Sequence, residues 1–105
     1  MSAPFNLTLQ TGQTARLVAI PMFNGQDGGV LPGPVTWNHN CPPANATVEL
    51  NPTSNNDCTI RVTQVLIGPS TSFTVTAVSG GLTANCVITV GQLANDMRIN
   101  AFILP

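Results

Sequence analysis

The chain has 105 residues, the size of a single domain, and 7% of them are charged, against about 25% in a typical soluble domain. It contains no lysine, and its basic residues are Arg16, Arg61 and Arg98. This balance excludes phosphate-driven binding of nucleic acid and electrostatic binding to an anionic membrane, because both need clustered positive charge. A net charge of −1 gives little repulsion between copies, which favours a protein that works inside an assembly.

Targeting signals are not visible in the sequence. No run of about 20 apolar residues could cross a bilayer as a helix. The N-terminus has no basic region followed by an apolar run, so no signal peptide is predicted. We therefore expect either a chain that stays in the cytosol or a piece of a longer secreted protein.

Apolar and polar residues alternate with period two along most of the chain, and turn residues interrupt them at intervals, which is typical of an all-β sandwich or barrel. The first predicted strand is residues 5–9 and the second is residues 15–19. A loop rich in Gly and Pro is predicted over residues 24–34. The third strand, residues 34–38, contains Trp37.

The second half of the chain continues the same pattern. Its predicted strands are residues 46–50, 58–63, 72–77 and 82–90. The Gly80-Gly81 pair predicts a tight hairpin before the last of them. No segment has a convincing helical spacing of apolar residues; residues 93–103 are a weak candidate only.

The inward faces of these strands supply enough apolar residues for a core, and Trp37 is expected to make its largest single contribution. Burying each large side chain is worth roughly 1.5–3 kcal/mol before the opposing entropy. The other core residues singled out by the pattern are Leu17, Val35, Ile60, Phe73, Val75 and Ile88.

Several segments follow one another in an order that points to a family. They are residues 7–14, 17–21, 35–38, 73–77 and 81–90. This order resembles that of the group 2 bacterial immunoglobulin-like domains. The resemblance implies an immunoglobulin-like antiparallel β-sandwich of about seven strands over residues 1–91, followed by an apolar tail or arm over residues 92–105. Such domains are packing and display modules of bacterial surface proteins, adhesins and tailed-phage structural proteins, and they imply no catalytic residue and no cofactor.

Two sets of residues carry groups that could do chemistry. His39, the only histidine, could act as a base with Cys41 as nucleophile and Asp57 as orienting acid. No oxyanion-hole motif lies nearby, so we expect a solvated loop histidine and no enzyme. His39 with Cys41, Cys58 and Cys86 offers zinc ligands, but without the short paired spacing of a zinc site. We expect no metal and no cofactor.

The cysteines and the acidic loop residue leave further alternatives. A disulfide between Cys41 and Cys58 would close a short loop in an oxidising compartment, whereas free thiols are expected in a reducing one. The three cysteines cannot all pair with one another. Asp27 alone supplies too few oxygens for calcium, so a flexible turn is expected there.

The C-terminal tail is the most informative feature, because its apolar residues need a cover. One alternative is that the tail folds back as an extra strand on its own sheet. The other is that it docks on a neighbouring protein. The predicted partner-binding residues are Met97, Ile99, Phe102, Ile103 and Leu104.

Together these features predict a non-catalytic structural protein of a bacteriophage virion, a capsid decoration protein, assembled in the host cytoplasm. Its partner would be a capsid or other virion protein, or another copy of itself, and many identical contacts on a lattice would compensate for weak single ones. One alternative is a display or adhesin module at the bacterial cell surface. Another is a carbohydrate-binding module, which the absence of tyrosine and the single tryptophan disfavour.

Overall fold

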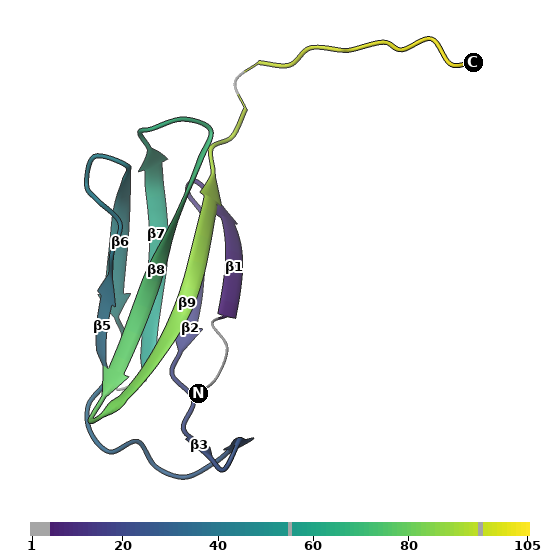
Figure 1. Cartoon of the computed structure of the whole chain (residues 1–105). Helices are drawn as coiled ribbons and strands as arrows, with labels where there is room; N and C mark the ends of the chain where they lie inside the picture. Colours follow the sequence, from purple (N-terminus) through teal and green to yellow (C-terminus); the bar gives the residue numbers. More distant parts are fainter. Residues whose placement is uncertain (1–4, 55, 95) are drawn as a thin grey trace.

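The computed structural model describes residues 5–54, 56–94 and 96–105, and within these residues the chain forms strands and no helix (Figure 1). The strands are β1 (Phe5–Gln10), β2 (Thr14–Val18), β3 (Met22–Phe23), β4 (Gln26–Asp27), β5 (Thr36–His39), β6 (Ala46–Pro52), β7 (Asp57–Val65), β8 (Ser70–Ser79) and β9 (Leu82–Gly91). None of the described segments is a helix long and apolar enough to span a membrane. The all-β prediction is confirmed.

The strands form two larger sheets and one small hairpin. A four-stranded sheet has the order β1-β9-β8-β5, and a three-stranded sheet has the order β2-β7-β6. Their pairings are antiparallel, except that β1 runs parallel to β9, with Phe5 opposite Cys86 and Gln10 opposite Gly91. Both sheets contribute to one buried apolar cluster, which gives the body a sandwich-like character.

The alternation of the sequence explains which face of each strand is buried. In β8, Phe73, Val75 and Ala77 are buried while Ser72 is exposed, and in β7, Ile60 and Val62 have no exposed surface. Side chains two residues apart point to the same face of a strand, so these residues meet across the two sheets. The buried apolar residues are Leu9, Leu17, Cys41, Ala46, Cys58, Ile60, Val62, Val65, Phe73, Val75, Ala77, Ile88 and Val90.

Two predicted core residues lie at the margin of this cluster. Trp37 packs against it but is only partly buried, and Val35 is also partly exposed. Both lie in or beside β5, which is an edge strand of the four-stranded sheet. The fully buried centre is formed instead by β7, β8 and β9, so Trp37 is not the middle of the core.

The predicted loop after residue 24 is wrong in part, because β3 and β4 form a hairpin there. Met22 pairs with Asp27 and Phe23 pairs with Gln26. Asn24 and Gly25 connect them with φ values of 52° and 80°. Two consecutive positive φ values are typical of the type I′ turn, which favours an Asn-Gly pair. The hairpin lies at the end of the body opposite the C-terminal segment (Figure 1).

A second tight turn joins β8 to β9 at the same end of the body (Figure 1). Gly80 has a φ of 56°, and an added Cβ there would meet the Pro32 side chain at 2.7 Å. The buried Ser79 hydroxyl donates to the Gly33 carbonyl at 2.7 Å and accepts from the Gly33 amide at 3.2 Å. These contacts fix residues 32–33 against the β8–β9 turn.

Candidate interaction surface

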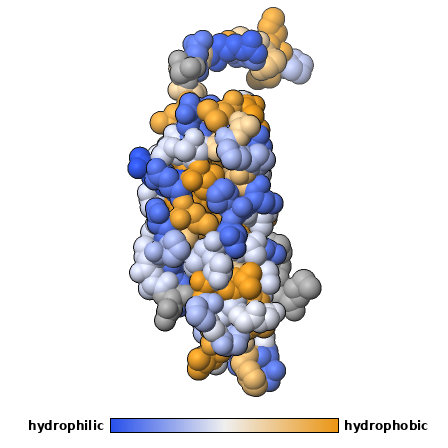
Figure 2. Space-filling view, turned by 90° about the vertical axis from the view of Figure 1, so that its left-hand side faces the viewer, coloured by the Kyte–Doolittle hydropathy of each residue, from blue (hydrophilic) through white to orange (hydrophobic). Residues whose placement is uncertain are grey.

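The C-terminal segment leaves the body after β9 as an extended arm, which we define as residues 92–105 with residue 95 outside the described part. It stands clear of the sheets (Figures 1 and 2). No described residue of the arm belongs to a strand. The alternative in which this segment folds back as an added strand is therefore not found for the described residues. None of the described residues in the range 93–103 is helical either, as the weak helical spacing led us to expect.

The arm is anchored at its first residue. The Gln92 amide donates to the Pro69 carbonyl at 2.8 Å. Its side-chain Nε2 donates to the carbonyls of Val65 and Gly68 at 2.8 and 3.1 Å. Three hydrogen bonds to the β7–β8 connection hold this point at the end of the body, so the arm begins from a fixed position and not from a loose strand end.

Apolar side chains of the arm are exposed. Ile99 is 90% exposed and Phe102 is 82% exposed. The predicted partner-binding residues Met97, Ile103 and Leu104 are exposed as well. Figure 2 shows hydrophobic atoms at the tip of the arm, after a hydrophilic stretch nearer the body. Exposed apolar surface of this kind marks an interaction site or an aggregation hazard.

The body contains an apolar depression at the opposite end from the arm anchor, which we call the end groove. One wall is the segment of residues 18–22 that leaves β2, and the other is formed by Ala77 of β8 with residues 82–86 of β9. Two adjoining hollows of about 470 and 400 Å³ make up the groove, and they share Ala19, Ile20, Ala77 and Ala84.

The end groove exists because the inward side chains become smaller towards this end. Along β8 they change from Phe73 and Val75 to Ala77 and Ser79. Along β9, read from its last residue backwards, Val90 and Ile88 give way to Cys86 and Ala84, before the large Leu82 at the rim. Small residues at inward positions leave the space between the sheets unfilled, whereas native interiors are close-packed.

The rim of the groove exposes large apolar side chains. Ile20 is 56% exposed and Leu82 is 57% exposed, and Val18 and Met22 are exposed too. Leu82 and Ala84 occupy the inward face of β9, the face that is fully buried at Ile88. The apolar inward faces of the sheets thus continue from the core into the two walls of the groove, where they are exposed to solvent.

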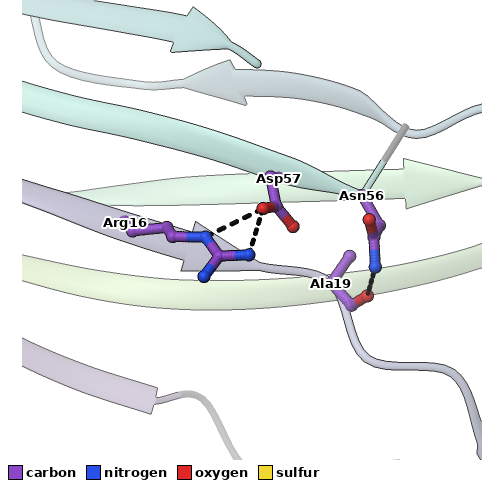
Figure 3. Close-up of polar contacts among 4 residues, drawn as sticks. All are labelled: Arg16, Ala19, Asn56 and Asp57. Carbon is purple, nitrogen blue, oxygen red and sulfur yellow. Dashed lines mark hydrogen bonds and ion pairs between the residues drawn. The ribbon is translucent and has the colours of Figure 1, made fainter. Parts of the chain in front are cut away.

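The wall formed by residues 18–22 is held in place by polar contacts (Figure 3). The Ala19 amide donates to the Asn56 carbonyl at 2.7 Å, and Asn56 Nδ2 donates to the Ala19 carbonyl at 3.4 Å. Beside them, Arg16 Nε donates to Asp57 Oδ2 at 2.8 Å, and its Nη2 forms an ion pair with the same oxygen. The Arg16 side chain is largely exposed, so this pair is worth about 0–1 kcal/mol and serves mainly to position the strand ends.

Trp37 also borders the end groove. Its indole Nε1 is buried, and no described protein group accepts a hydrogen bond from it. A buried donor without an acceptor costs roughly 1–3 kcal/mol. Because Trp37 is the only tryptophan of the chain, its fluorescence reports on this region alone.

The residues considered for catalysis do not come together. The Cys41 amide donates to His39 Nδ1 at 3.1 Å, so these two residues are neighbours at the end of β5. Asp57 lies instead in β7 of the other sheet, where it pairs with Arg16. His39 is exposed and its ring lies edge-on to Phe73, with 5.8 Å between the ring centroids.

The three cysteines are separate free thiols. Cys58 lies in β7, Cys86 lies in β9, and Cys41 follows β5. Burial raises the pKa of each thiol, and backbone hydrogen bonds partly offset this effect at Cys41 and Cys58. Burial thus favours the protonated thiol over the thiolate, which is the nucleophile and the metal ligand.

Metal-binding geometry is also not found where the sequence offered ligands. In the part of the chain that the structure describes, no three His, Cys, Asp or Glu side chains are grouped so that they could hold an ion. Asp27, the residue considered for calcium, is exposed in the two-residue strand β4. It pairs there with Met22 of β3.

Sequence reasoning identified the arm but missed the end groove and the Gln92 anchor. The small inward residues Ala77, Ser79 and Ala84, which flank the β8–β9 turn, were a readable signal for the groove. The Gln92 contacts join residues more than twenty positions apart, so no local pattern could have revealed them. No family model, curated protein or solved structure matches this chain.

Proposed function

We propose that this chain is a non-catalytic structural protein with an immunoglobulin-like sandwich, and that it binds a repeating protein lattice of a bacteriophage virion, such as the outer surface of a capsid, through its C-terminal arm. The observation that carries the proposal is the arm itself: a segment with exposed Ile99 and Phe102 that is anchored to the body at Gln92 and then stands clear of the sheets (Figure 1). An extended peptide of this kind binds by adding a strand or by inserting apolar anchors.

The body supports a structural role. Its surface is polar through Thr, Ser, Asn and Gln instead of charge, and the net charge is −1. Copies of such a protein can crowd on a lattice without strong mutual repulsion. The outward face of β8 and β9 is an example, where Ser72 and Thr89 share a hydrogen bond at 3.0 Å and Thr76 donates to Asn85 at 3.0 Å.

The test is incorporation into particles. The chain is produced with an N-terminal tag in the host during phage assembly, and particles are isolated on a density gradient. We expect many copies of the chain per particle. Ile99→Asp should abolish incorporation, because it places a charge on an apolar anchor. Asn100→Asp is the matched control, since it adds the same charge at the next residue.

The outcomes separate the parts of the proposal. A chain that stays entirely in the soluble fraction would show that it is not a virion protein. If the protein is found on the outer surface of intact cells, where added protease can cleave it, this result would favour the display-module alternative. If Ile99→Asp enters particles as well as the unmodified chain does, the arm is not the binding element.

A further inference from the structure

We propose that the arm of one copy fills the end groove of a second copy, so that the copies associate head to tail. This inference rests on the proposed role of the arm as a binding element, and it names the occupant of the groove and the partner of the arm. The two surfaces have matching chemistry. The groove walls are apolar and include the small side chains of Ala19, Ala77 and Ala84, and the arm presents larger apolar side chains that could fill the space beside them.

The arm has the residue pattern of a strand that could enter between the sheets. Met97, Ile99, Ala101 and Ile103 alternate with Arg98, Asn100 and Phe102. In an extended segment the first group shares one face. Residues 96–105 span at most about 35 Å when extended, which exceeds the roughly 13 Å that residues 82–86 of β9 cover along the groove wall. The inward positions of Ala77 and Ala84 leave room for the Ile side chains.

The geometry favours a second copy over the arm's own body. The anchor at Gln92 lies at one end of the body and the end groove lies at the other (Figure 1). A return along the edge of β9 would pass Cys86 to Gly91, and β1 already pairs with that length of the strand. An arm that enters a neighbour meets no such obstacle.

The two halves of this contact lie on different surfaces of the molecule. In the proposed head-to-tail arrangement each pair of copies leaves one arm and one groove free, so the contact extends into rings or open chains of copies. Each copy contributes one arm and one groove. This is the kind of contact that a lattice of identical subunits needs, and the near-neutral charge of the chain does not oppose it.

The experiment measures association of the full-length chain by sedimentation velocity and light scattering over micromolar to millimolar concentrations. The unmodified chain is expected to form species larger than a dimer as its concentration rises. Ile99→Asp prevents the arm from binding a groove, and Ala84→Arg fills the groove with a charged side chain. Each variant should weaken self-association about tenfold or more. The controls Asn100→Asp and Asn38→Arg, which add the same charges elsewhere on the arm and on the outward side of β5, should associate like the unmodified chain.

The decisive sample is a mixture of the two defective variants. Ile99→Asp retains its groove and Ala84→Arg retains its arm, so together they should form a 1:1 dimer and stop there. Trp37 emission should shift in the mixture and not in either variant alone. Circular dichroism spectra and thermal midpoints of the variants show that each one is folded.

Three results would overturn the inference. The first is a chain that remains monomeric at millimolar concentration. The second is Ala84→Arg that associates like the unmodified chain; if Ile99→Asp still prevents particle incorporation, the proposed function stands and the arm binds elsewhere. The third is a difference in Trp37 emission between monomeric Ile99→Asp and the unmodified chain at concentrations where both are monomers. This difference would mean that the arm of the unmodified chain occupies the groove of its own body.

Discussion

At the level of single residues, Trp37 carries two opposing effects. Its ring packs against the core, yet its buried Nε1 has no described acceptor. Trp37→Ala should lower the free energy of unfolding by about 2–4 kcal/mol, since it removes a large side chain that is only partly buried. Trp37→Phe should cost much less, because it keeps most of the apolar contact and removes the unpaired donor. Urea unfolding followed by circular dichroism measures both, and equal costs for the two variants would contradict this account.

The buried thiols make the stability of the protein dependent on alkaline pH. Burial raises the pKa of Cys41, Cys58 and Cys86 in the folded chain above the value of about 9 in the unfolded chain. Above that pH the unfolded chain releases protons that the folded chain keeps, so the free energy of unfolding falls as the pH rises. The urea midpoint should therefore be level near neutral pH and decrease above about pH 9.

The control for this prediction is Cys58→Ala, which removes the one cysteine with no exposed surface. The decrease of its urea midpoint above about pH 9 should be shallower than that of the unmodified chain. An identical slope in both proteins would assign the alkaline decrease to other groups.

At the level of elements, the β8–β9 turn depends on one glycine and not on its neighbour. Gly80 has a positive φ, and a Cβ there would lie 2.7 Å from Pro32 Cγ, whereas a Cβ on Gly81 would meet nothing within 4 Å. Gly80→Ala should cost about 1–3 kcal/mol through backbone strain and displacement of the Pro32 loop. Gly81→Ala should change stability by about 0.5 kcal/mol or less. Thermal melts of the two variants provide the comparison, and equal midpoints would show that the turn adapts.

Strand alternation was sufficient to predict the longer strands. The period-two pattern in residues 72–77 and 82–90 corresponds to β8 and β9, because a half-buried strand must alternate its side chains. The Asn24-Gly25 pair is a local signal for the β3–β4 hairpin, whereas the surrounding Gly and Pro residues favour a loop. Strand pairing could not be predicted from local patterns, because the parallel pairing of β1 with β9 joins residues some eighty positions apart.

The candidate site shows the same division between local and long-range information. The apolar composition of residues 97–104 identifies the arm directly from the sequence. The end groove requires β2, β8 and β9 to be placed together, and it requires Ala77 and Ala84 to face the same space. Trp37 is expected from its size to make the largest single contribution to the core, but its position on the edge strand β5 leaves it at the margin.

At the level of the whole molecule, the proposed contact between arm and groove is weak on its own. Each buried Ile, Leu or Phe contributes roughly 1.5–3 kcal/mol. Ordering the arm costs about 1–2 kcal/mol for each residue that becomes fixed, and association adds a further cost. A single contact is therefore reversible, whereas many contacts on a lattice hold a copy firmly.

The parallel pairing of β1 with β9 also has a mechanical consequence. β9 runs from the end groove to the arm anchor. If one neighbour holds a copy at its groove and another pulls on its arm, the force acts along the axis of this strand. The hydrogen bonds to β8 and β1 lie across that axis, and force along the strand loads them together instead of opening them one by one. The sandwich would then act as a stiff link, and a chain of copies under tension would lengthen first in its arms.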